Sequence, residues 1–136
     1  MRLVFADTFY WIAMASPRDH WNTKTVAVSN SLGPALFVTT DAVLIEFLNA
    51  YAAQAPERRE AAARNVRGML KNPTIKVIEQ DRALFLEGLE LYESRKDKGY
   101  SLTDCISMVT MRKEKLTDVL TNDHHFTQES FTILIV

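Results

Sequence analysis

Four acidic residues stand in, beside or directly after apolar stretches, where a charge calls for an explanation. They are Asp7, Glu46, Asp104 and Asp123. Two carboxylates about 4 Å apart repel each other by roughly 4 kcal/mol at an effective dielectric constant near 20, so several in one cleft need a cation between them. Carboxylate oxygens suit Mg²⁺, or Mn²⁺, better than zinc or copper. If the four acids converge, we expect a metal ion that lowers the pKa of a bound water and directs it at a phosphodiester.

Hydroxyl and amide side chains flank three of these acids. They belong to Thr8, Thr103, Thr121 and Asn122. Groups of this kind orient metal ligands and metal-bound water through hydrogen bonds. We therefore predict that these four side chains surround the metal site.

Each acid taken singly also has a structural explanation. Ser101 and Asp104 are spaced as in a capping box, in which a carboxylate satisfies backbone N–H groups at a helix start. Asp7 would cap the next helix, Glu46 would point to solvent, and Asp123 would be a turn residue. For any one acid, structure explains the residue at least as well as function does. The functional interpretation therefore depends on a fold that brings all four together.

Short apolar runs alternate with helical patterns along the chain. Runs at Leu3–Ala6, Leu36–Val38, Ile75–Ile78, Val119–Thr121 and Phe131–Val136 predict strands, and patterns near 9–14, 20–31, 41–53, 57–70, 81–98 and 101–112 predict helices. Strands separated by helices predict an α/β fold, a three-layer α/β/α sandwich around a central parallel sheet of four to five short strands. Sites in such folds lie at the carboxyl ends of the strands.

That edge of the sheet is where the four acids are expected to meet. Asp7 and Asp123 each follow a predicted strand. Asp104 opens the helix that leads into the strand before Asp123, and Glu46 lies on the helix after the second strand. Taken jointly, the purely structural explanations are weaker than they are singly.

Length and composition predict one ordinary globular domain over residues 1–136, with 47% hydrophobic and 24% charged residues. The formal net charge of −1 argues against binding to nucleic acid or membrane by bulk electrostatics, so a nucleic-acid role must rest on a site. Cys105 is the only cysteine, which excludes an internal disulfide, and no ligand-pair spacing supports zinc. We find no signal peptide or membrane span in the sequence and expect a cytoplasmic protein.

The assembled motifs resemble those of the PIN-domain ribonucleases, and within that family the VapC toxins of bacterial toxin–antitoxin pairs. The resemblance covers essentially the whole chain. It rests on Phe5-Ala6-Asp7-Thr8, Glu46, Leu102-Thr103-Asp104-Cys105 and Leu120-Thr121-Asn122-Asp123-His124-His125-Phe126. Each motif is short, and the specificity lies in the order, spacing and strand context of the four acids.

This resemblance implies that Asp7, Glu46, Asp104 and Asp123 hold Mg²⁺ or Mn²⁺ and activate water for RNA cleavage. It also implies a homodimer and inhibition by a cognate antitoxin whose tail covers the active site. Two departures stand out. Phe9 takes a position where many relatives have Ser or Thr, and the segment Gln128–Phe131 lacks a glycine often found before the last strand.

Other features have two interpretations each. The aromatic residues Phe9, Tyr10, Trp11 and Trp21 would form a partner-binding groove or, as burial preferences favour, part of the core. The cations Arg95, Lys96, Lys98, Arg112, Lys113 and Lys115 would steer RNA phosphates or lie on solvated helix ends, and the latter is favoured for most of them. The basic face of the helix at 57–70 is expected to be solvated. Of His124 and His125, at most one can face the site because they are adjacent.

Two other functions are weighed against a nuclease. A phosphatase with a strand-end aspartate nucleophile usually needs a second acid two residues on, and Phe9 occupies that position. A catalytically silent PIN-like module that binds RNA or protein remains the alternative. Retention of four mutually repelling carboxylates disfavours a silent copy.

Overall fold

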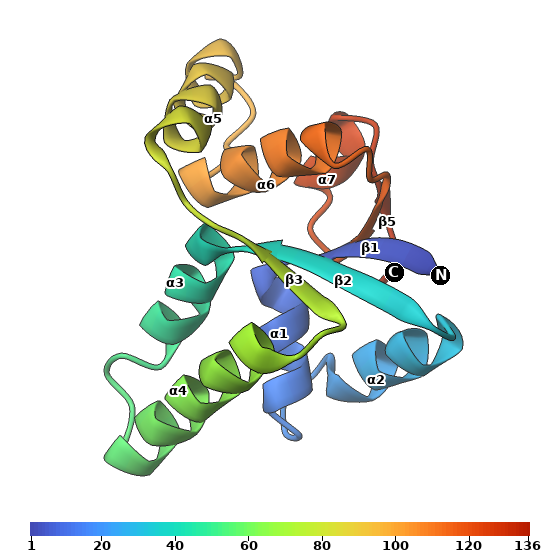
Figure 1. Cartoon of the computed structure of the whole chain (residues 1–136), viewed down its shortest axis with the longest axis vertical. Coiled ribbons are helices and arrows are strands. Elements are labelled where there is room, and N and C mark those ends of the chain that lie inside the picture. The colour runs from blue at the N-terminus through green and yellow to red at the C-terminus, as the bar shows by residue number, and fades with distance from the viewer.

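A central parallel sheet organises the computed structural model, which describes residues 1–136 (Figure 1). Its five strands are β1 Arg2–Ala6, β2 Ala35–Thr40, β3 Ile75–Ile78, β4 Asp118–Leu120 and β5 Thr132–Ile133, in the order β3-β2-β1-β4-β5. All neighbouring strands are parallel, and Phe5 of the central strand pairs with Val38 on one side and Val119 on the other. The predicted α/β fold with a parallel sheet is confirmed.

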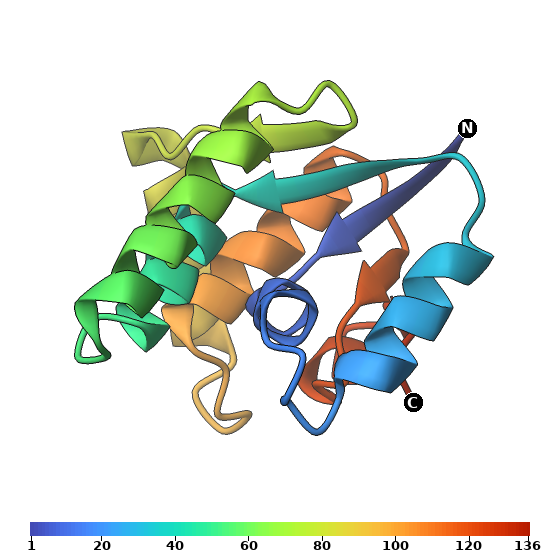
Figure 2. The same ribbon diagram turned by 90° about the horizontal axis from the view of Figure 1, so that it is seen from below.

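Helices cover both faces of this sheet, as the sequence predicts. They are α1 Thr8–Ala15, α2 Asn22–Ser31, α3 Asp41–Ala50, α4 Pro56–Lys71, α5 Arg82–Ser94, α6 Leu102–Lys113 and α7 His125–Gln128. Figure 1 shows α5, α6 and α7 on one face and α1 to α4 on the other. The view from below in Figure 2 places α1, α2 and α4 in front of the sheet.

Two elements differ from the prediction near the C-terminus. The run Phe131–Val136 pairs as a regular strand only over Thr132–Ile133, because its partner β4 has only three residues. The extended chain still donates from the Leu134 and Ile135 N–H groups to the carbonyls of Val119 and Thr121. The helix α7 is not predicted, since four residues are too few for a 3.6-residue periodicity to be visible.

The core lies on both sides of the central strand. Val4, Phe5 and Ala6 of β1 are fully buried, as expected for a strand covered on both faces. Tyr10 and Trp11 are buried in the same core, which supports the burial interpretation of the aromatic residues. Phe9 and Trp21 are half-buried and pack edge to face with their ring centroids 5.5 Å apart. None of the helices combines the length and hydropathy that a membrane-crossing segment requires.

Candidate metal and active site

Asp7 lies at the junction of β1 and α1 and is almost completely buried, with 5% of its surface exposed. Its backbone N–H donates to the Leu120 carbonyl at the end of β4, 3.4 Å away. The side chain makes no capping hydrogen bond to α1, so the simple capping explanation fails for this residue. Burial, followed by the charge of Asp104 and more weakly that of Glu46, raises the pKa of the Asp7 carboxyl to about 7.

Thr121 connects Asp7 to Asp123. It follows β4 and is fully buried. Its hydroxyl donates to Asp7 Oδ2 at 2.9 Å and accepts from the Asp123 N–H at 3.1 Å. One hydroxyl therefore fixes the carboxylate at the end of β1 relative to the loop after β4. Thr121 is the one flanking polar residue whose side chain hydrogen-bonds directly to one of the four carboxylates.

Asp104 has the structural role that its spacing from Ser101 predicts. The Ser101 hydroxyl accepts from the Asp104 N–H and Asp104 Oδ2 accepts from the Ser101 N–H, each at 3.0 Å, which forms a reciprocal capping box at the start of α6. Yet the side chain is only 14% exposed. Burial and the charge of Asp123 raise its pKa, against the opposing effects of the capping hydrogen bonds and His125. The cap and the acid cluster thus share one carboxylate.

Asp123 and Glu46 complete the set from two further elements. Asp123 Oδ1 accepts from the His125 N–H at 2.9 Å, so its predicted turn role is also present. Glu46 is half-buried on α3, beside the buried Phe47, and forms no ion pair with a basic side chain. Its charge also raises the pKa of Asp7, though less than burial and the charge of Asp104 do.

The other predicted flanking residues have different surroundings. Asn122 turns away, because its Nδ2 donates to the Ile135 carbonyl at 2.7 Å and holds the C-terminal segment. Thr103 is half-buried beside Asp104. The Thr8 hydroxyl is buried without a hydrogen-bond partner. Direct support of the carboxylates is therefore observed for Thr121 and not for Asn122.

His125 is the site residue that sequence reasoning does not single out. Its Nδ1 lies 3.3 Å from Asp123 Oδ1 and 3.6 Å from Asp104 Oδ2. His124, by contrast, is exposed. The expectation that at most one of the two histidines faces the site is met. It is His125, because the turn at Asp123 brings the residue two positions further along the chain next to the carboxylates.

Residues 4–130 match the PIN domain family. The chain belongs to the PIN domain family. Sequence comparison with curated proteins gives no match.

Solved structures with the same fold include toxins and toxin–antitoxin complexes. The Mycobacterium tuberculosis VapC20, described as a sarcin-ricin loop cleaving toxin, superposes with a TM-score of 0.82 at 22% identity, covering 95% of this chain and 96% of that one. A toxin–antitoxin complex from Klebsiella pneumoniae gives 0.64 at 15% identity, with 89% and 87% covered. VapBC2 from Rickettsia felis, bound to a promoter DNA fragment, gives 0.62 at 13% identity, with 96% of each chain covered. At these identities the likeness concerns the fold.

The donor set of this PIN domain fits a divalent cation. No lysine or arginine forms an ion pair with Asp7, Glu46, Asp104 or Asp123. His125 is thus the one basic side chain beside the cluster, and burial and mutual repulsion still raise the pKa values of Asp7 and Asp104. A hard divalent ion such as Mg²⁺ or Mn²⁺ matches carboxylate oxygens and supplies the missing positive charge.

Proposed function

We propose that this chain is an Mg²⁺- or Mn²⁺-dependent endoribonuclease, folded as a single nuclease domain, and that it is the VapC-type toxin of a toxin–antitoxin pair. One observation carries the proposal. Four acids, from the end of β1, from α3, from the start of α6 and from the loop after β4, interact electrostatically in a PIN domain, and no lysine or arginine is paired with them. Such clusters serve phosphoryl chemistry when a metal ion neutralises them.

In this mechanism Asp7, Asp104 and Asp123 would hold the ion, with Glu46 beside it. The chemistry supplied by such an ion would be a lowered pKa of a bound water molecule and an offset to the charge that develops on the phosphate. Thr121 and Ser101 fix the Asp7 and Asp104 carboxylates in advance, so little reorganisation is needed. Glu46, half-buried and free of an ion-pair partner, accepts the proton of the attacking water.

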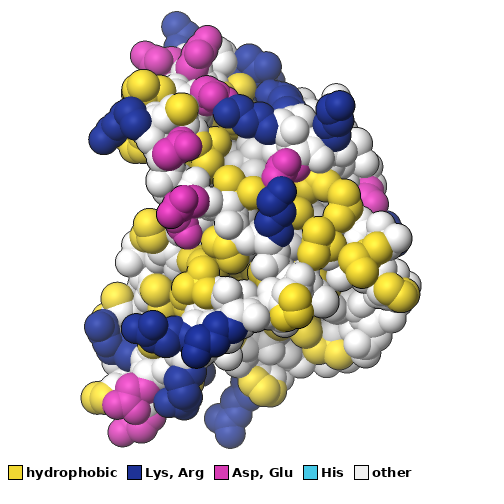
Figure 3. All heavy atoms as spheres, viewed as in Figure 1, with side chains coloured by type: hydrophobic (Ala, Val, Ile, Leu, Met, Phe, Trp, Pro, Cys, Tyr) yellow, Lys and Arg dark blue, Asp and Glu magenta, His cyan; other side chains and the backbone are white.

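The RNA is held by cations outside this acidic site. Five basic residues of α4 form no ion pair with an acidic side chain, and they are Arg58, Arg59, Arg64, Arg67 and Lys71. Figure 3 shows basic side chains gathered along α4. By contrast, Arg95 and Arg112 are both paired with Glu129, and Lys113 with Glu87. We therefore assign the phosphate contacts to α4 and not to Arg95, Arg112 or Lys113.

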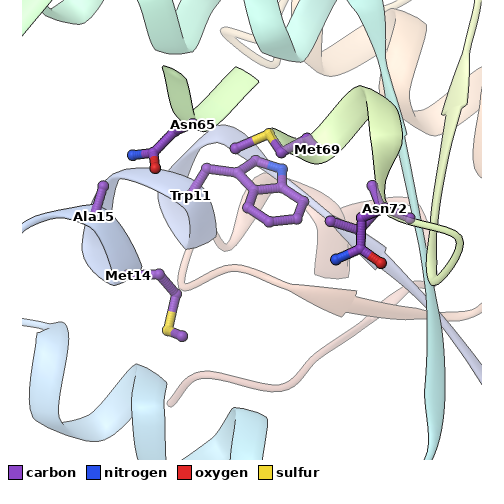
Figure 4. A pocket seen from close by; sticks show the side chains of 7 residues that line it. Trp11, Met14, Ala15, Asn65, Met69 and Asn72 are labelled. Carbon is purple, nitrogen blue, oxygen red and sulfur yellow. The ribbon is translucent and has the colours of Figure 1, made fainter. Parts of the chain in front are cut away.

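An apolar pocket between α1 and α4 supports a protein partner. It has a volume of about 260 Å³ and is lined by Trp11, Met14, Ala15, Asn65, Met69, Asn72 and Ile75 (Figure 4). We propose that an apolar side chain of the antitoxin enters it, as in the groove interpretation of the aromatic residues. Exposed Ile45 on α3 and exposed Leu86 and Tyr92 on α5 are apolar surface for the proposed homodimer.

The nuclease proposal is tested with purified protein and structured RNAs, including a sarcin-ricin loop oligonucleotide, in Mg²⁺, in Mn²⁺ and in chelator. We expect cleavage only with metal, and a loss of at least about a hundredfold in Asp104→Asn, whose amide oxygen still accepts the Ser101 N–H. Asp97→Asn, an exposed acid outside the cluster, is the matched control. Folded protein that binds these RNAs but leaves them intact under every metal condition would establish the silent module instead.

A further inference from the structure

The ring nitrogen Nδ1 of His125 has the position of a metal ligand. It is buried and has no hydrogen-bond partner. It lies 3.3 Å from Asp123 Oδ1 and 3.6 Å from Asp104 Oδ2, and one ligand atom from each residue falls within 4.8 Å of the others. Neighbouring ligands of an octahedral ion bound at about 2.1 Å lie about 3 Å apart, and opposite ligands about 4.2 Å apart. The three side chains thus offer ligand atoms that are spaced closely enough to share one ion after small movements.

The His125 ring is held by groups outside the acid cluster. The Tyr100 ring packs against it with the centroids 5.2 Å apart and the planes at 62°. The Tyr100 hydroxyl donates to Glu129 Oε2 at 2.9 Å, and the almost buried Glu129 carboxylate is itself fixed by Arg95 and Arg112. The direction of Nδ1 is therefore set by packing that does not depend on an ion.

A proton on Nδ1 is the competing explanation for its place between two carboxylates. Charge-assisted N–H···O⁻ bonds have lengths of about 2.7–2.9 Å. Both distances here are longer, and neither contact has hydrogen-bond geometry. The same distances are compatible with a ring nitrogen that would face an ion bound between the two carboxylates.

We infer that His125 Nδ1 is a direct ligand of the ion held by Asp104 and Asp123, and that this site takes Mn²⁺ in preference to Mg²⁺. The inference rests on the proposed function only in requiring that a divalent ion binds among the carboxylates. The preference follows from ligand chemistry, because imidazole nitrogen suits transition metals, whereas Mg²⁺ favours oxygen.

The test compares His125→Leu and His125→Asn with His124→Leu, a matched control at the exposed neighbouring histidine. Mn²⁺ affinity is measured on the full chain from the EPR signal of free Mn²⁺, and Mg²⁺ affinity by calorimetry. We expect His125→Leu to weaken Mn²⁺ binding by about tenfold or more. His125→Asn, which offers an oxygen in place of nitrogen, keeps Mg²⁺ binding while losing the Mn²⁺ preference. His124→Leu changes neither affinity.

A spectroscopic signature separates a ligand from a mere neighbour. Electron spin-echo modulation from a directly bound nitrogen is expected on Mn²⁺ in the wild type and in His124→Leu, and it is absent in His125→Leu. Unchanged or tighter Mn²⁺ binding in His125→Leu overturns the inference, the tighter result pointing to an ion pair that competes with metal. A wild-type chain that binds neither ion overturns the proposed metal site as well, which is a distinct outcome. Circular dichroism in chelator checks that each variant is folded.

Discussion

Asp7 is a buried carboxyl group whose ionised form has little to stabilise it. A carboxyl group buried to this degree is stable as an anion only when hydrogen bonds or positive charges compensate for the lost water. Thr121 supplies one hydrogen bond, but Asp104 and Glu46 add negative charge. The pKa of about 7 is the result, so without metal the Asp7 carboxyl binds a proton as the pH falls below about 7.

The first prediction concerns the stability of Asp7→Asn in chelator. The folded pKa of about 7 exceeds the ordinary value of 3.8, so the folded state binds more protons between these values. The wild type therefore loses stability as the pH rises from about 4 to about 7, and the loss is complete above that range. Asp7→Asn lacks this loss, and above pH 7 it should be the more stable protein, by up to about 4 kcal/mol.

Urea denaturation at pH 5 and pH 8 measures this effect for the wild type, Asp7→Asn and the exposed control Asp97→Asn. The advantage of Asp7→Asn must grow between the two pH values, while Asp97→Asn follows the wild type. A constant difference at both pH values would mean that Asp7 is ionised throughout and that burial does not shift its titration.

At the scale of elements, the site is built by strand ends and by one helix start. The apolar runs that become β1 and β4 locate Asp7 and Asp123, because parallel strands ending at one edge bring the residues after them together. The capping role of Asp104 can be predicted from its spacing to Ser101. This spacing alone does not reveal that the same carboxylate is buried near Asp123. These parts of the fold and site follow from sequence periodicity.

Other features of the fold and the site cannot be predicted from sequence periodicity. His125 enters the site because the Asp123 carboxylate accepts its N–H, a turn that leaves no periodic signal in the sequence. The short α7 is hidden for the same reason. The regular pairing of β5 covers only Thr132 and Ile133, opposite Asp118 and Val119, so its length depends on the neighbouring strand and not on its own apolar residues alone. Ion pairs between distant residues also cannot be predicted from periodicity. Glu129, for example, pairs with both Arg95 and Arg112, which lie far from it in the sequence.

The second prediction belongs to α4. Arg64, Arg67 and Lys71 are exposed and recur at i, i+3 and i+7, so they share one face of the helix. We expect the triple change of these residues to Gln to weaken RNA binding and to reduce the slope of log K against log[salt] by about 2 to 3, since each phosphate contact contributes about 0.7 to 0.9. Fluorescence anisotropy in chelator measures binding without cleavage.

The matched control for α4 changes three other exposed cations that form no ion pair, namely Lys24, Arg82 and Lys96, to Gln. Both triple variants lower the net charge equally, so a general electrostatic effect would alter both salt slopes alike. An equal loss in the two variants would contradict a specific role for α4 and would leave only long-range attraction.

For the whole molecule, a net charge near zero conceals an uneven distribution. The formal charge is −1, yet four acids meet at the sheet edge while five cations without an ion pair lie on α4. Under the proposed function, an RNA phosphate would be attracted to α4 and repelled from the acidic site until a cation is bound there. A bound ion would then serve both the stability of the fold and the approach of the substrate.

The last prediction links metal binding to the stability of the whole domain. A metal at one hundred times its Kd is expected to raise the free energy of unfolding by about 2.7 kcal/mol, provided that the unfolded chain does not bind it. The double variant Asp104→Asn/Asp123→Asn should lose this gain. Without metal it should be at least as stable as the wild type, because a repulsion is removed while the amide oxygen introduced by Asp104→Asn still accepts the Ser101 N–H. Urea titrations with Mn²⁺, Mg²⁺ and chelator measure both quantities.

Equal stabilisation of the wild type and the double variant by metal would place the ion elsewhere. A large loss of stability in the metal-free variant would show that these carboxylates serve the fold more than the metal.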